Sequence, residues 1–175
     1  MKKSNFFKIS KNLFIESFNH QPPSLEMVNE LEDIAIEALE TLRLTNENLD
    51  FDFEGIEEID AFIEGIGDNR DLEIFEGICF AFSIFICKVL CDFCGGRILH
   101  KFEAGYFDVV IGDIIVSPFQ QMMIKFHDIK NEPKNDLINF AEDVYALSLT
   151  STSEKLVMDY QIAQWDEEKR LALLN

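Results

Sequence analysis

Basic residues are scarce in this chain. Its 175 residues include 33 Asp and Glu but only 15 Lys and Arg, which gives a formal net charge of −18. Nucleic-acid binding depends on Lys and Arg, which displace counterions from phosphates, so this charge argues against nucleic acid as a partner. An anionic membrane surface is disfavoured for the same reason.

Long apolar runs are also missing. Acidic residues precede the most apolar stretch, Ile78–Ile86, and Lys88 and Asp92 follow it. The run is therefore shorter than the about 20 apolar residues that a membrane-spanning helix needs. The N-terminus begins like a secretion signal, with two lysines before apolar residues, but further charges interrupt it and no small-residue cleavage site follows. We expect no export signal and no membrane partner.

Cysteines are few and close together. The four of them occupy positions 79, 87, 91 and 94 in one predicted helix, which is not the spaced framework of a secreted domain. This favours reduced thiols and a cytoplasmic location. Cys91 and Cys94 form a CxxC pair, but zinc sites draw ligands from two separated elements and no second pair is present. Cys91 and Arg97 have the spacing of a cysteine phosphatase loop, yet the cysteine lies at a helix end, where the dipole has the wrong sign. We predict buried cysteines that act as small hydrophobic residues.

The usual catalytic motifs are absent. The sequence has no HExxH pair, no GxSxG elbow and no glycine-rich phosphate loop after a strand. Its three histidines, His20, His100 and His127, are dispersed along the chain. We therefore predict a protein that is not an enzyme and needs no cofactor, with a metal- or thiol-dependent enzyme as the less favoured alternative.

What the chain does contain is a concentrated acidic segment. Residues 24–76 hold 18 Asp and Glu against 2 Lys and Arg, so this third carries −16 of the total charge. Two amphipathic helices are predicted within it, one from the N-cap Ser24 to about Arg43 and one over residues 54–66. In both, apolar positions form one side and carboxylates the other. The predicted outward carboxylates are Glu26, Glu30, Asp33, Glu37 and Glu40 in the first helix, and Glu54, Glu57, Glu58 and Glu64 in the second.

A partial cation-binding pattern lies between these helices. Asp50, Asp52, Glu54 and Gly55 match the first half of a calcium loop. The twelfth position, which requires a bidentate acid, is Ala61. We predict a solvated acidic loop without metal and keep a degenerate cation site as the weaker alternative.

The remainder of the sequence predicts an α+β fold. A buried central helix over residues 70–94 ends at Gly95-Gly96, and the strands 97–103, 106–111 and 114–117 form a three-stranded antiparallel meander. Ser117-Pro118 then opens a helix with a serine N-cap, and helices near residues 135–148 and 153–172 follow.

We expect one globular domain over residues 1–175. It comprises an N-terminal docking segment (1–23), the acidic helices (24–76) and the core helix, meander and C-terminal helices (77–175). Aromatic residues within 6–18 are expected to dock that segment onto the domain. A basic amphipathic membrane anchor is the alternative for the same residues.

Residues 70–130 combine an apolar helix ending in Gly95-Gly96-Arg97, a hairpin, and Val116-Ser117-Pro118-Phe119 opening a helix. This plan resembles small bacterial domains of uncharacterised function. This chain has Ile98 where a tryptophan is common in those domains. The resemblance implies a bacterial origin and an α+β plan, and it transfers no functional residue.

These observations favour a binding protein that neutralises a basic partner. Bacterial immunity proteins, which inhibit toxic nucleases, are similar in general character because they are small, acidic and without catalytic residues. A concentrated carboxylate surface steers basic proteins toward it and repels acidic ones. The nine outward carboxylates are the expected partner-binding residues. The alternative is a structural or interaction domain whose acidic helices only keep it in solution.

Overall fold

The structure, a computed structural model, has the predicted α+β fold. It describes residues 7, 20–66, 72–101, 104–112, 114–127 and 136–149, and only the backbone of 72–74. The elements in chain order are β1 (His20–Gln21), α1 (Leu25–Leu42), α2 (Phe53–Ile66), α3 (Leu72–Phe93), β2 (Arg97–Lys101), β3 (Tyr106–Ile111), β4 (Ile114–Val116), α4 (Pro118–His127) and α5 (Leu137–Leu149).

The sheet has four antiparallel strands in the order β1-β2-β3-β4. Strands β2, β3 and β4 form the predicted meander. The three-strand prediction missed β1, in which His20 pairs with Lys101 and Gln21 with His100. A strand of two residues shows no alternation of apolar and polar side chains, so the sequence pattern could not reveal it.

Helix α1 follows its predicted pattern closely. The Ser24 hydroxyl accepts a hydrogen bond from the Met27 N–H at 3.2 Å, as expected of an N-cap. One face of the helix is buried and the other is exposed. The buried residues are Val28, Leu31, Ala35, Ala38, Leu39 and Leu42.

Helix α3 is the central element, as predicted. It contacts each of the other four helices and strands β2 and β3. The helix ends at Phe93, and Gly95 then takes a φ of +69°, a conformation that favours glycine. The next residue, Gly96, lies so close to β3 that a Cβ there would be 2.4 Å from a Val109 methyl carbon. The paired glycines therefore end the helix and allow the sheet to pack against it.

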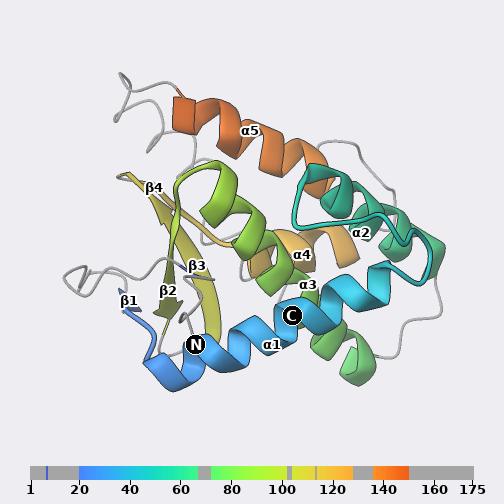
Figure 1. The fold of residues 1–175 in the computed structure, drawn as a ribbon, viewed down its shortest axis with the longest axis horizontal. Helices are drawn as coiled ribbons and strands as arrows, with labels where there is room; N and C mark the ends of the chain where they lie inside the picture. Colours follow the sequence, from blue (N-terminus) through green and yellow to red (C-terminus); the bar gives the residue numbers. More distant parts are fainter. Residues whose placement is uncertain are drawn as a thin grey trace.

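The elements surround α3 on several sides (Figure 1). The sheet lies on one side of it, α1 crosses in front, and α5 runs along another side, where it packs against α2. A single apolar cluster joins helices and sheet, and Phe85, Ile84 and Leu90 of α3 are fully buried within it. None of the helices in the described part of the chain has the length and apolarity needed to cross a membrane.

The start of α4 differs from its predicted cap. Pro118 is the first helical residue, as predicted, and the Ser117 carbonyl accepts from the Gln121 N–H at 3.1 Å. The Ser117 hydroxyl, however, is buried and has no hydrogen-bond partner among the described residues, so it does not cap the helix.

Two predicted segments fall largely outside the described residues. They are the helix at 153–172 and the docking segment at 6–18, including its alternative as a membrane anchor. Phe7 is described, and it is 4% exposed and part of the apolar core.

Candidate functional site

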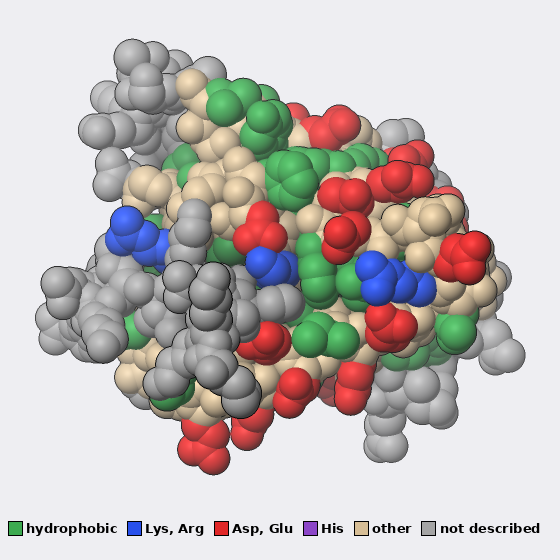
Figure 2. Space-filling model, viewed as in Figure 1, with side chains coloured by type: hydrophobic (Ala, Val, Ile, Leu, Met, Phe, Trp, Pro, Cys, Tyr) green, Lys and Arg blue, Asp and Glu red, His purple; other side chains and the backbone are tan. Residues whose placement is uncertain are grey.

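A row of carboxylates runs along the outer face of α1. Figure 2 shows acidic side chains following this helix along the lower edge of the molecule. We call the five predicted residues the acidic ridge, and all five are exposed: Glu26, Glu30, Asp33, Glu37 and Glu40. Glu40 pairs with Arg43 at 3.0 Å. The other four have no basic side chain within ion-pair distance among the described residues.

The predicted carboxylates of α2 do not form a second free ridge. Glu54 and Glu57 are exposed, as predicted. Glu58 is half-buried and accepts a hydrogen bond from the Thr45 hydroxyl at 2.7 Å. Glu64 is exposed but binds the Lys125 ammonium at 2.7 Å. Two of the four carboxylates therefore hold neighbouring elements of the fold together.

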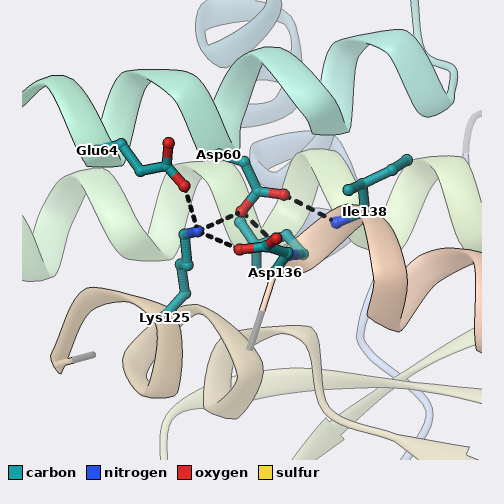
Figure 3. A network of polar contacts seen from close by, with 6 residues as sticks. Asp60, Glu64, Lys125, Asp136 and Ile138 are labelled. Carbon is teal, nitrogen blue, oxygen red and sulfur yellow. Dashed lines mark hydrogen bonds and ion pairs between the residues drawn. The ribbon is translucent and has the colours of Figure 1, made fainter. Parts of the chain in front are cut away.

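Lys125 of α4 lies at the centre of a buried ion cluster that sequence analysis missed (Figure 3). Its side chain is 0% exposed, and its Nζ lies 2.5 Å from Asp136, 2.7 Å from Glu64 and 3.5 Å from Asp60. We call Asp60, Glu64, Lys125 and Asp136 the buried ion cluster, because Lys125 and Asp60 at its centre are buried, although Glu64 reaches solvent. Its members come from α2, from α4 and from the residue before α5, so it joins three helices.

Asp60 has a second role as the cap of α5. Its two carboxylate oxygens accept hydrogen bonds from the N–H groups of Leu137 and Ile138, at 3.0 and 2.9 Å. These are among the N–H groups that a helix leaves without internal partners, and a negative charge there is favoured by the helix dipole. A sequence signal for this role exists. Asp60 lies between the inward positions of α2, one turn from Ile56 and Ile63, where a charged residue requires a partner.

The electrostatics of the buried ion cluster favour a charged Lys125. Burial acts to lower the pKa of Lys125, but hydrogen bonds to Asp136 and Glu64, and the charge of Asp60, together raise it well above its usual value. The lysine therefore stays protonated and is not a nucleophile at neutral pH. Burial raises the pKa of Asp60, despite the opposing backbone hydrogen bonds and Lys125.

The partial calcium loop has a structural use. An Asp50 oxygen accepts from the Phe51 N–H at 2.9 Å. An Asp52 oxygen accepts from the Gly55 N–H at 3.0 Å, which caps the first turn of α2. Within the described ranges, no group of three or more His, Cys, Asp or Glu side chains is arranged to hold a metal ion. Asp50, Asp52 and Glu54 thus do not converge on a common point.

The cysteines are free thiols, and three of them are buried. Cys79, Cys87 and Cys91 are at most 2% exposed, while Cys94 is half-buried. Burial raises the pKa of Cys87 well above its usual value, and the neighbouring Cys91 and Asp108 act in the same direction. Burial also raises the pKa of Cys94. Since the thiolate is the reactive form, the raised pKa values make Cys87 and Cys94 poor nucleophiles.

This burial predicts a simple thiol titration. In the folded protein at pH 8, Cys94 should react slowly with Ellman's reagent, and the other three cysteines should react only after unfolding in guanidinium chloride. Replacing Cys94 with Ser should remove the native-state reaction. Rapid reaction of Cys87 or Cys91 in the folded protein would contradict the buried placement.

Two of the dispersed histidines, His20 and His100, lie in adjacent strands and on opposite faces of the sheet. His20 of β1 lies 2.5 Å from the Asp108 carboxylate of β3, and both side chains are buried. The strand register places His20 and Asp108 on the same face of the sheet. His100 stacks on Phe107 with ring centroids 5.0 Å apart, and burial, together with His20, lowers its pKa. The sequence holds one signal for the pairing of His20 with Asp108. Asp108 is the single charged residue in the otherwise apolar strand Tyr106–Ile111.

Comparisons with known proteins assign no role to these residues. The chain matches no protein-family model, no curated protein and no solved structure. The case for function therefore depends on the geometry and charge of the described residues.

Proposed function

We propose that the protein is a non-enzymatic acidic binding protein that neutralises a basic partner, as bacterial immunity proteins neutralise toxins such as nucleases. The observation that carries this proposal is the acidic ridge. Its carboxylates are exposed, lie on one face of a well-capped helix, and are mostly without basic partners in the described part of the chain. The proposal includes a cytoplasmic location in a bacterium, consistent with the resemblance of residues 70–130 to small bacterial domains.

The acidic ridge destabilises the helix that carries it, which favours a function for these carboxylates. Like charges one turn apart, such as Glu26 with Glu30 and Asp33 with Glu37, destabilise a helix by about 0.2–0.5 kcal/mol per pair. A nuclease presents Lys and Arg where it binds phosphate. Carboxylates at helical spacing meet such a surface with complementary charge, which accelerates association.

The ridge predicts a specific effect of charge reversal. We expect the triple variant E30K/D33K/E37K to reduce kon for a basic partner captured with the wild-type protein from its source cells by roughly tenfold or more at low salt. We also expect a flatter dependence of kon on ionic strength, because fewer favourable charges remain to be screened. Stopped-flow association between about 25 and 300 mM salt measures both effects.

A matched variant separates the ridge from net charge. Replacing Glu47, Glu76 and Asp143 with Lys changes the total charge equally but leaves the ridge intact. These three residues are also exposed. If this control slows association as much as the ridge variant does, or if neither has an effect, the ridge is not the interface. The acidic helices would then serve only to keep the protein in solution.

A further inference from the structure

Three aromatic side chains from three helices meet at the surface. Phe53 begins α2, Phe93 ends α3 and Tyr145 lies in α5. The Phe53 ring is 5.3 Å from that of Phe93 and 5.7 Å from that of Tyr145, both in edge-to-face geometry. Leu149 follows Tyr145 by one helical turn. We call Phe53, Phe93, Tyr145 and Leu149 the aromatic patch.

The patch is exposed although its residues are large and apolar. Phe93 is 47% exposed, Tyr145 is 37% exposed and Leu149 is 65% exposed. Figure 2 shows hydrophobic side chains gathered between α5 and the start of α2, on the same side of the molecule as the acidic side chains of α1. Contiguous exposed apolar groups with a polar rim are typical of protein-binding sites, and aromatic residues dominate their binding energy.

The aromatic patch is also held in place by contacts between its own rings. Phe53 is only partly exposed and contacts both of the other rings, so the three rings support one another. Edge-to-face pairs of this kind contribute beyond the area they bury. Helix α5 also packs against both α2 and α3. A surface fixed in this way loses little conformational freedom when it binds.

Acidic residues border the patch on all three helices. Glu57 follows Phe53 by four positions and Glu142 precedes Tyr145 by three, so each shares a helix face with its aromatic neighbour. Glu54 and Asp92 are adjacent in sequence to Phe53 and Phe93. All four are exposed, and Asp92 pairs with Lys88 at 2.6 Å. A ligand for this surface therefore needs apolar groups at its centre and positive charge around them.

We propose that the aromatic patch binds a Lys- and Arg-rich segment of a protein partner by holding one or more of its apolar side chains. This inference rests on the proposed function and adds to it a division of roles. The acidic ridge accelerates the encounter, and the patch slows dissociation. A second copy of the same chain fits poorly, because pairing two patches would bring Glu54, Glu57 and Glu142 against their own equivalents.

Two synthetic helical peptides of equal positive charge provide the test. One carries Leu and Trp along one face between lysines, and the other has Ser and Gln at those positions. Binding to the full-length protein is measured by isothermal titration calorimetry. We expect the amphipathic peptide to bind at least tenfold more tightly than its polar counterpart.

Substitutions then locate the binding surface. The double variant F93S/Y145S should weaken the amphipathic peptide roughly tenfold or more, while Leu25→Ser, at an exposed leucine of α1, should leave binding unchanged. E57K/E142K should also weaken it, whereas Glu76→Lys, on α3, should have little effect. Equal binding of wild type and F93S/Y145S would overturn the inference, as would equal loss in L25S.

The proposal would also be overturned if the aromatic patch is occupied by a second copy of the chain or by another part of the same chain, and each case gives its own result. If F93S/Y145S converts a dimer to a monomer in sedimentation, the patch joins two copies of this chain. If the amphipathic peptide binds the wild type no more tightly than the polar peptide does, while F93S/Y145S lowers Tm by several degrees, the patch is covered by the chain itself.

Binding measurements with the natural partner distinguish failure of this inference from failure of the proposed function. If the patch inference alone is wrong, binding of a basic nuclease will be weakened by E30K/D33K/E37K but not by F93S/Y145S. The reverse result, with koff raised by F93S/Y145S and kon unchanged by the ridge variant, would support the patch and refute the role of the ridge.

Discussion

Replacing Lys125 with Met is expected to lower the free energy of unfolding by about 3–5 kcal/mol, the range for removal of one partner from a buried ion pair. The methionine fills similar space but leaves Asp60, Glu64 and Asp136 without the ammonium that holds them together. Asp60 is 6% exposed, so little water replaces the lost charge. Urea denaturation at pH 7, followed by circular dichroism, measures the change.

Neutralising the Asp60 carboxylate tests whether charge causes the loss of stability in Lys125→Met. Asp60→Asn keeps an acceptor for the start of α5 and removes one negative charge. In the Lys125→Met background this second change should restore part of the lost stability, because it relieves the repulsion that the first change exposes. Asp60→Asn alone in the wild-type protein should be destabilising or neutral. If the two losses simply add, the effect of Lys125 is packing and not charge.

The pH dependence provides an independent measure. Because the pKa of Lys125 is raised in the folded protein, its contribution to stability is complete below the ordinary lysine pKa of about 10.4. The contribution is lost as pH rises from there through the higher native value. Wild type should therefore lose stability above about pH 10.4 more steeply than Lys125→Met. Parallel curves would show that Lys125 does not titrate as the cluster requires.

Replacing Gly55 with Ala is expected to destabilise the protein by about 1–3 kcal/mol, although alanine is normally favoured over glycine in a helix. A Cβ at this position would lie 2.4 Å from Cζ of Phe85 and 2.9 Å from the Asp50 carbonyl oxygen. Phe85 is fully buried and packs against Phe51 at 5.1 Å between ring centroids. Its ring cannot withdraw without disturbing the core, and the carbonyl belongs to the backbone.

Gly77→Ala provides the matched control in α3. A Cβ there meets no atom of the described residues within 4 Å, so only the backbone effect is expected. We expect this variant to gain about 0.5–1 kcal/mol. Thermal denaturation of both variants should therefore shift Tm in opposite directions. A Gly55→Ala variant as stable as Gly77→Ala would mean that α2 does not approach α3 as closely as the structure shows.

The sequence predicted an element correctly where the pattern of its own residues reflects which of its sides are buried. Helix α1 has one face toward the core and one toward solvent, so its apolar residues repeat with the helical period. The same reasoning identified the central helix, because α3 is surrounded by the other elements and is apolar nearly all round. Gly95-Gly96 marked its end correctly.

The missed features depend on contacts between distant positions. Asp60 and Lys125 are 65 positions apart, and nothing near either residue specifies the other. For the same reason Glu64 was predicted among the free carboxylates, although Lys125 binds it. The aromatic patch was also missed, since it requires residues from three helices whose relative placement the sequence pattern does not give. Ser117 carried the pattern of a cap, but its hydroxyl is buried without a described partner.

Asp60 also has a consequence for the order in which the chain folds. Its hydrogen bonds to the start of α5 join residues 77 and 78 positions apart. Contacts of such long range form only after a large loop has closed, whereas single helices form from neighbouring residues. We infer that α5 docks late, after α2 and α3 have come together. Until then Phe53 and Phe93 lack Tyr145, so the surface that we propose for the partner is complete only in the finished protein.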